Sequence, residues 1–174
     1  MPGAPPPFPL IDADPHAGRV LRFMRPSDYA WWAGCTAAVP ATLALLEHAD
    51  PTIQNKSQLR MGYRAGGFLG LTFGFLFSYQ RSSLRFWGWT ENQREQDLDM
   101  KEMSERARRG LPLYGVSSES PWIQNIAFRN SHNSQLLFHA VPWFNLVNHP
   151  YHGVDTSKYY LAAGVPVPTQ EGQQ

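Results

Sequence analysis

Two long apolar stretches dominate the first half of the chain. Residues 29–46 contain no charged side chain, and residues 61–80 contain only Arg64, close to their start. At about 1.5 Å per residue, a helix over either stretch would be roughly 27–30 Å long, close to the hydrocarbon thickness of a bilayer. Aromatic residues cluster at an end of each stretch, as they do at membrane interfaces. The pattern predicts transmembrane helices over 29–46 and 61–80, joined into a hairpin by the polar loop 47–60.

The sequence on either side of the hairpin is more polar. Residues 1–28 open with an extended, Pro-rich arm and continue into a basic stretch before the first span. Residues 81–110 leave the second span with aromatic and basic side chains and become a charged helix that ends at Gly110. Residues 111–174 predict irregular, aromatic-rich coil with one short helix near 125–139. The expected fold is mainly α: a two-helix transmembrane hairpin, an extended N-terminal arm, and an extramembrane C-terminal helix plus irregular coil.

Small residues recur at every fourth position in both spans. Positions four apart lie on one face of a helix, so each row forms a strip of nearly bare backbone. In lipid, where burying apolar side chains gives little drive for association, such strips let helices approach closely. The predicted helix-packing residues are Ala30, Gly34, Ala38 and Thr42 in the first span, and Gly62, Gly66, Gly70, Gly74 and Ser78 in the second. The rows suit a tight hairpin or a hairpin held against a third helix.

A soluble protein with two buried, glycine-bearing helices is the alternative fold. Each interior Gly costs about 1 kcal/mol relative to Ala in water, so four or five in one helix would be heavily penalised without a packing reason. The membrane hairpin is therefore favoured. The loop side of the hairpin carries Lys56, Arg60 and Arg64, whereas the side of the termini carries more arginines. This charge bias favours both termini on the cytoplasmic or matrix side.

The sequence offers no cluster of residues suited to catalysis. The formal net charge of +1 gives no field suited to nucleic acid. Cys35 is the single cysteine, so neither a disulfide nor a cysteine-based zinc site can form within the chain. His149 and His152 stand three apart in HPYH, but no carboxylate or cysteine adjoins them, and exposed or interfacial histidines are expected. No nucleophile elbow, P-loop or dinucleotide motif is present. We expect no catalytic, metal or cofactor site and no small-molecule substrate.

The far end of the second span combines cationic and aromatic side chains. Arg81, Arg85, Trp87 and Trp89 are suited to hold an anionic lipid headgroup such as that of cardiolipin. Such residues more commonly anchor the end of a membrane helix, and that interpretation is favoured. A bound phospholipid is therefore the only non-protein ligand that the sequence suggests.

Four segments resemble a known family: PPFPLIDADPHAGRVLRFMRPSDYA, LRMGYRAGGFLG, QRSSLRFWGW and VNHPYHGVDTSKYY. They are similar to the fungal 21-kDa accessory subunit of mitochondrial respiratory complex I, and the resemblance covers nearly the whole chain. It implies a subunit of the mitochondrial inner membrane, where the predicted hairpin would be multi-pass and the charge bias would favour both termini on the matrix side. It also implies no flavin, iron–sulfur or quinone chemistry of its own. The work implied is assembly and stabilisation of the membrane arm, with the other membrane-arm subunits as partners.

Two other functions remain open from the sequence. One is a component or assembly factor of another inner-membrane complex, such as a translocase built from Gly-rich hairpins. The other is a soluble enzyme of unknown type. In the favoured interpretation, the N-terminal arm and the aromatic coil lie on neighbouring subunits.

Overall fold

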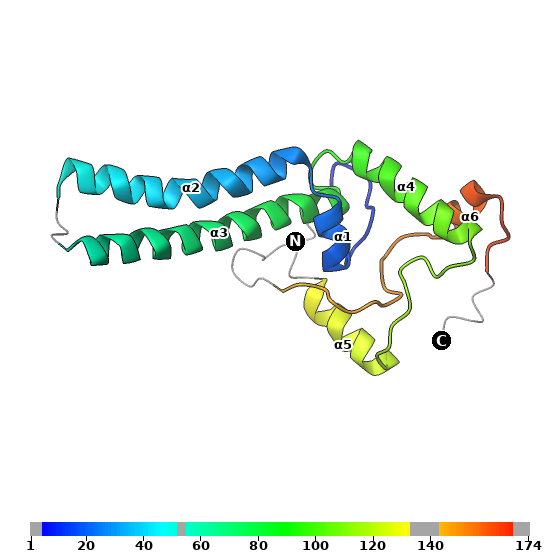
Figure 1. The fold of residues 1–174 in the computed structure, drawn as a ribbon. Helices are drawn as coiled ribbons and strands as arrows, with labels where there is room; N and C mark the ends of the chain where they lie inside the picture. Colours follow the sequence, from blue (N-terminus) through cyan, green and yellow to red (C-terminus); the bar gives the residue numbers. More distant parts are fainter. Residues whose placement is uncertain (1–4, 52–54, 133–142, 169–174) are drawn as a thin grey trace. The chain divides into compact units, whose positions relative to one another are not determined.

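The computed structural model describes residues 5–51, 55–132 and 143–168. Over these residues the chain is helical and contains no β-strand. The helices, labelled in Figure 1, are α1 (Ala17–Arg22), α2 (Pro26–Ala49), α3 (Lys56–Phe86), α4 (Gln93–Arg108), α5 (Pro121–Ser131) and α6 (Ser157–Ala163). The prediction of a mainly α fold is confirmed.

The chain divides into two compact units, which are described separately. The hairpin unit comprises Met24–Ser82, with α2 and most of α3. The terminal unit combines the residues up to Phe23 with those from Ser83 onward, and so contains both ends of the chain.

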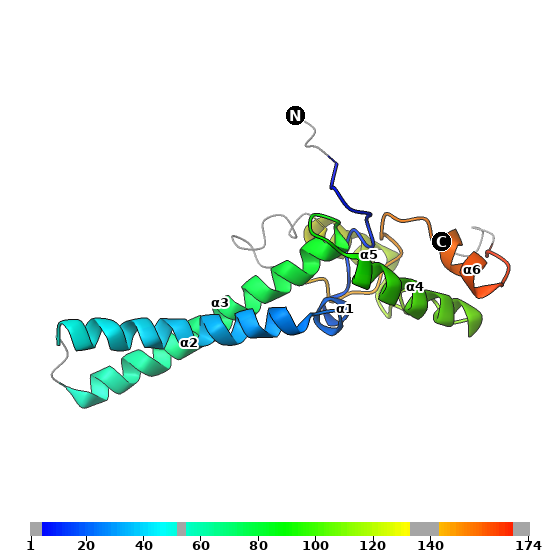
Figure 2. The same ribbon diagram turned by 90° about the horizontal axis from the view of Figure 1, so that it is seen from above.

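The hairpin unit consists of two long helices that run side by side in Figure 1 and cross each other in Figure 2. Pro26 occupies the first turn of α2, where a missing N–H costs nothing, and the Asp28 carboxylate accepts a 2.8 Å hydrogen bond from the Arg25 N–H. The helix continues through Pro40. Both helices are longer than predicted, because polar residues at either end of the apolar stretches also adopt helical backbone.

One helix of the described residues, α2, is long and apolar enough to cross a membrane, whereas the sequence predicts two such helices. α3 has ample length, but its glycines, which have almost no hydropathy, and its several arginines lower its mean hydropathy. The hairpin is thus present as a helical structure, and by this measure only its first helix has the composition of a span.

The core of the terminal unit lies between α4 and α6. Met103 and Ala107 of α4 pack with Leu113 and Tyr159, and all four side chains are buried. A second apolar contact joins Phe23 to Phe86, whose ring centroids are 5.2 Å apart. Met103 and Ala107 therefore place one face of the otherwise charged helix α4 in the core of the terminal unit.

The N-terminal arm binds to the rest of its own terminal unit. Its backbone N–H groups donate to carbonyl oxygens of distant residues: Phe8 to Gly88 at 3.1 Å, Ile11 to Phe86 at 2.9 Å, Ala13 to His152 at 2.9 Å, and Ala17 to Asn145 at 2.7 Å. The prediction that the arm lies on a neighbouring subunit is wrong for these residues. The close approach depends on Gly88, which has φ +73° and where a Cβ atom would lie 2.2 Å from the Phe8 carbonyl oxygen.

The C-terminal segment is more ordered than the coil that the sequence predicts. α5 begins at Pro121, and the Ser120 hydroxyl accepts a 3.4 Å hydrogen bond from the Ile123 N–H. The helix predicted near 125–139 is thus shifted toward the N-terminus, and its part beyond residue 132 lies outside the described residues. α6 was not predicted at all.

Candidate functional site

The glycine row of α3 faces α2 at its centre. A Cβ atom at Gly70 would lie 2.7 Å from the carbonyl oxygen of Cys35 and 2.9 Å from that of Thr36. At Gly74 it would lie 2.8 Å from the carbonyl oxygen of Trp32. Backbone atoms cannot move aside as the end of a side chain can, so the two helices can pack this closely only with glycine at both positions.

The two ends of the same row differ from each other. A Cβ atom at Gly66 would meet the end of the Leu43 side chain at 2.9 Å. Beyond the glycines, the Ser78 hydroxyl donates a 2.8 Å hydrogen bond to the Asp28 carbonyl oxygen. Gly62, by contrast, has no atom of a neighbouring segment within 4 Å of its Cβ position. The predicted row therefore contacts α2 from Gly66 to Ser78 and leaves Gly62 open.

α2 meets this groove with a face other than its small-residue row. At Gly70 and Gly74 the groove receives the α2 backbone itself. Beside this contact the Trp32 ring lies 5.2 Å from that of Phe75, and its indole N–H donates to the Leu71 carbonyl oxygen at 3.0 Å. The α2 residues that contact the glycine row are Trp32, Cys35, Thr36, Val39, Pro40 and Leu43.

The small-residue row of α2 therefore lies outside the hairpin interface. At about 100° per residue, the row falls on the side of α2 opposite to these contacts. The row residues Ala30, Gly34, Ala38 and Thr42 are all exposed. Gly34 has open space at its Cβ position. This corrects the version of the prediction in which both rows close one tight hairpin. A contact with a third helix stays a prediction.

Arg81 has the position that a lipid headgroup contact would need. Its Nε lies 3.4 Å from the buried Asp28 carboxylate, and its side chain is 37 % exposed. Its guanidinium carbon lies 5.7 Å from the Trp31 ring centroid and 5.9 Å from that of Phe77. The cation is thus fixed between an acid and two rings, with part of its surface open.

Arg85 does not have such a position, which corrects the prediction for this residue. It is 4 % exposed, and its Nε lies 3.4 Å from a carboxylate oxygen of Glu95, which is fully buried. A guanidinium enclosed in this way cannot reach a lipid headgroup. Trp87 is half-buried and Trp89 is exposed. Arg81 and Trp89 are therefore the more accessible of the four predicted lipid contacts.

A buried polar cluster joins the N-terminal arm to the remainder of the terminal unit, and the sequence analysis missed it. We call it the strap cluster. Its members are Asp12 and Asp14 of the arm, Arg19 of α1, Asp99 of α4, and His149 and His152 of the C-terminal segment, each 6 % exposed or less. The expectation that the two histidines are exposed or interfacial is wrong. Their partners lie more than a hundred residues away in sequence, and local patterns cannot reveal such pairs.

Arg19 connects three elements within the strap cluster. One guanidinium nitrogen lies 3.3 Å from an Asp12 carboxylate oxygen and another contacts Asp99, whose second oxygen accepts a 2.6 Å hydrogen bond from the Tyr159 hydroxyl. Burial alone would lower the pKa of Arg19, but the charges of Asp99 and Asp12 outweigh burial and raise the pKa above its ordinary value. Arg19 is thus permanently charged.

Asp14 and His149 form the second part of the cluster. His149 Nε2 lies 3.0 Å from an Asp14 carboxylate oxygen, and its Nδ1 accepts a 3.2 Å hydrogen bond from the Tyr151 N–H. The same Asp14 oxygen accepts from the Ser131 hydroxyl, and the Asn145 amide donates to the Asp14 carbonyl oxygen at 2.9 Å. His149 Nε2 also lies 3.1 Å from the Asn145 amide nitrogen, so it faces both the Asp14 carboxylate and an amide donor.

Two buried tyrosines border the cluster. Burial raises the pKa of Tyr114 and, to a lesser extent, Asp12 adds to this shift. Burial, and then the charge of Asp99, likewise raises the pKa of Tyr159. Both phenols therefore remain neutral at physiological pH. The Tyr114 ring stacks on that of His152, with centroids 3.5 Å apart.

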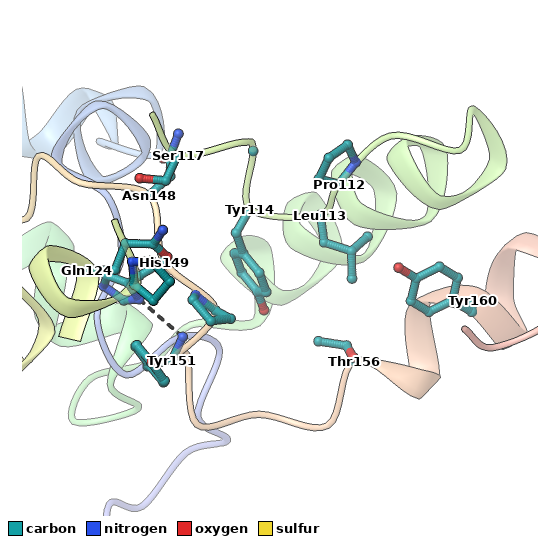
Figure 3. Close-up of a pocket in the computed structure, with 13 residues that line it drawn as sticks. Pro112, Leu113, Tyr114, Ser117, Gln124, Asn148, His149, Tyr151, Thr156 and Tyr160 are labelled. Carbon is teal, nitrogen blue, oxygen red and sulfur yellow. Dashed lines mark hydrogen bonds between the residues drawn. The ribbon is translucent and has the colours of Figure 1, made fainter. Parts of the chain in front are cut away.

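A cavity of about 570 Å³ opens beside the cluster in the terminal unit (Figure 3). Tyr114, Tyr151 and Tyr160 supply flat rings to its wall, and Gln124 and Asn148 supply amides. His149 also borders it, but this ring is already hydrogen-bonded to Asp14 and Tyr151. Among the residues that the structure describes, its wall contains no carboxylate, lysine or arginine. Over the described residues, no group of three or more His, Cys, Asp or Glu side chains has the arrangement of a metal site.

The buried acids and bases of the terminal unit bind one another, and the hairpin unit presents packing surfaces. This combination is typical of a structural helical subunit of a larger assembly. Comparison with known proteins identifies the family to which the chain belongs. Residues 5–91 match the family model of the NADH-ubiquinone oxidoreductase complex I 21 kDa subunit, and residues 100–167 match that of the C-terminal part of the same subunit.

A characterised relative supports the same assignment. The chain is 47 % identical over 156 residues to the NADH-ubiquinone oxidoreductase 20.9 kDa subunit of Neurospora crassa, an alignment that covers 90 % of this chain and 82 % of the relative. The chain belongs to the 21 kDa subunit family of complex I, as the resemblance predicts. It is an accessory subunit and not a catalytic one, and its partners are other subunits of that complex.

Proposed function

We propose that this subunit supports assembly and stability of the membrane arm of complex I by inserting its helical hairpin into the mitochondrial inner membrane. One observation carries the proposal: no residue in the apolar stretch of α2 is fully buried within the described part of the chain. An apolar helix that packs on its own fold along one face only requires lipid or another protein around the rest. A soluble protein would bury such a helix in its core, so the same observation speaks against the soluble alternative.

The exposed side chains of α3 support insertion of the second helix as well. Phe68, Leu69, Leu71 and Phe73 are all exposed. Bulky apolar side chains suit contact with lipid tails, whereas the small-residue row of α2 suits contact with another helix. In this proposal both helices span the bilayer and both termini lie on the matrix side. The outer row of α2 then docks a transmembrane helix of a neighbouring membrane-arm subunit.

Replacing Gly34 with Leu tests the docking surface directly. The hairpin should persist, because open space surrounds the Gly34 Cβ position. The bulky side chain would hold the partner helix away, at a cost of roughly 1–3 kcal/mol. We expect the variant subunit to resist carbonate extraction as the wild type does, while the amount of assembled complex on native gels falls several-fold. A normal amount of complex would rule out this row as the docking surface.

The proposal includes an anionic phospholipid at Arg81, beside the exposed ring of Trp31. Replacement of Arg81 with Gln should reduce the phospholipid that mass spectrometry detects with the purified complex. Because this change removes a cation from beside the buried Asp28 carboxylate, the double variant Asp28→Asn/Arg81→Gln is the control. It removes the buried charge but still lacks the headgroup cation. Full lipid retention in the double variant would show that Arg81 only anchors the helix end.

A further inference from the structure

His152 is held by two hydrogen-bond acceptors, one at each ring nitrogen. Its Nδ1 lies 2.7 Å from an Asp12 carboxylate oxygen, and its Nε2 lies 2.6 Å from the His149 carbonyl oxygen. A carbonyl oxygen can only accept, so Nε2 must carry a proton. A second proton must lie between Nδ1 and the Asp12 oxygen, since otherwise two lone pairs would face each other at 2.7 Å.

The proton count does not depend on which of the two groups formally owns the second proton. An imidazolium beside a carboxylate and a neutral imidazole beside a carboxylic acid contain the same number of protons. Each contains one proton more than a neutral imidazole beside a carboxylate. At neutral pH, an unconstrained histidine is mostly uncharged and an unconstrained aspartate is ionised. Docking of the arm onto His152 therefore takes up one proton.

The charges that surround the pair favour this extra proton. Asp12 and Asp14 approach from the arm and Asp99 from α4, and against these three carboxylates stands the guanidinium of Arg19 from α1. Half-exposed Glu102 adds negative charge at 3.8 Å from Arg19. His149 and the phenols Tyr114 and Tyr159 belong to the same surroundings, and the cavity that Asp12 and His152 border is also lined by His16, Arg22 and Arg106. Among the buried charged groups of the cluster, three carboxylates still face one guanidinium before the proton is counted.

The same pair fixes the arm mechanically. The Ala13 N–H donates to the His152 carbonyl oxygen at 2.9 Å, and the Asp14 N–H donates to the Asp12 carboxylate at 3.0 Å. Loss of the bridging proton would place a carboxylate against a bare ring nitrogen at the centre of these contacts. The segment most affected is residues 11–17, which connects the chain start to α1.

We propose that docking of the N-terminal arm is proton-linked, so that the arm binds one proton at the Asp12–His152 pair when it docks and opens more readily as the pH rises. The sign follows from linkage: where the docked state holds more protons than the open state, docking weakens with increasing pH. Between the ordinary pKa values of a free aspartate and a free histidine, the open state already holds this proton, so the pair adds no pH dependence there.

Hydrogen–deuterium exchange on the purified complex between pH 6 and pH 8.5 tests this proposal. After correction for the intrinsic pH dependence of amide exchange, the opening of residues 11–17 should increase by up to about tenfold per pH unit above neutrality, as expected for one proton. Core amides of α4 serve as the internal reference. A flat profile for residues 11–17 in the wild type would overturn the proposal.

Two variants locate the proton. His152→Asn keeps an amide donor near the position of Nδ1 but cannot be protonated, so its profile should become flat. His149→Gln keeps a donor near the position of Nε2 toward Asp14, so its profile should retain the wild-type slope. If His152→Asn releases the arm at every pH, its own profile has no slope to compare. The test then rests on the wild type and His149→Gln, whose pH profiles should have the same slope. A slope that survives in His152→Asn or disappears in His149→Gln would contradict the assignment to Asp12–His152.

Discussion

Replacement of Gly70 by Leu should separate α2 from α3 and reduce the assembled complex to a small fraction of its normal amount. A side chain at this position meets the carbonyl oxygens of Cys35 and Thr36 at 2.7 Å and 2.9 Å, so two backbones would have to move apart. Overpacking against side chains costs about 1–3 kcal/mol, and a clash with backbone belongs at or above the upper end of this range. Quantitative native gels of mitochondrial membranes measure the result.

Gly62→Leu is the matched control for this prediction. It makes the same change, in the same helix and the same row, at a position with open space around it. We expect near-normal amounts of complex from Gly62→Leu. Equal losses from both variants would show that the effect comes from helix propensity or membrane insertion and not from the contact with α2. Normal assembly of Gly70→Leu would contradict the claim that α2 and α3 pack through the glycine row.

The second large effect is expected at Arg19. Its replacement by Met leaves the Asp12 and Asp99 carboxylates buried without their cation, and breaking a buried ion pair in this way costs about 3–5 kcal/mol. The terminal unit of the full-length chain should lose its protease resistance in the native membrane, while the hairpin remains inserted.

Arg22→Met provides the comparison for Arg19. Arg22 lies in the same short helix and pairs with Glu102 at 3.0 Å, but its side chain is 63 % exposed. An exposed pair of this kind contributes about 0–1 kcal/mol because water screens both charges. Protease resistance close to the wild type is expected for Arg22→Met. If Arg19→Met proved equally mild, the strap cluster would have little part in holding the terminal unit together.

The helices of the hairpin could be predicted because their signal is local. Apolar length and the four-residue spacing of Gly66, Gly70 and Gly74 specify both a helix and the face on which it packs. The partner face could not be derived in the same way. The contact face of α2 contains Cys35 and Thr36 as well as the larger Trp32 and Leu43, and local spacing does not distinguish it from the small-residue row. A rule that pairs small residues with small residues therefore gave the wrong side of α2 for the contact with α3.

The strap cluster could not be predicted, because its pairs join residues that are far apart in sequence. Asp12 and His152 are separated by 140 positions, and nothing near either residue indicates the other. Arg85 illustrates the same limit, since its place after a membrane helix suggests a lipid contact, whereas Glu95 in the next helix encloses it. The start of α5 is different, because its signal is local. Ser120 and Pro121 are ordinary helix-start residues, and they specify that the helix begins at Pro121.

A cryo-electron microscopy map of the intact complex should show α2 and α3 within the bilayer, in contact from Gly66 to Gly74. It should also show a helix from a neighbouring subunit along Ala30, Gly34, Ala38 and Thr42. A hairpin that lies outside the bilayer, or whose outer α2 row faces only lipid, would contradict the claim that this subunit acts through helix packing.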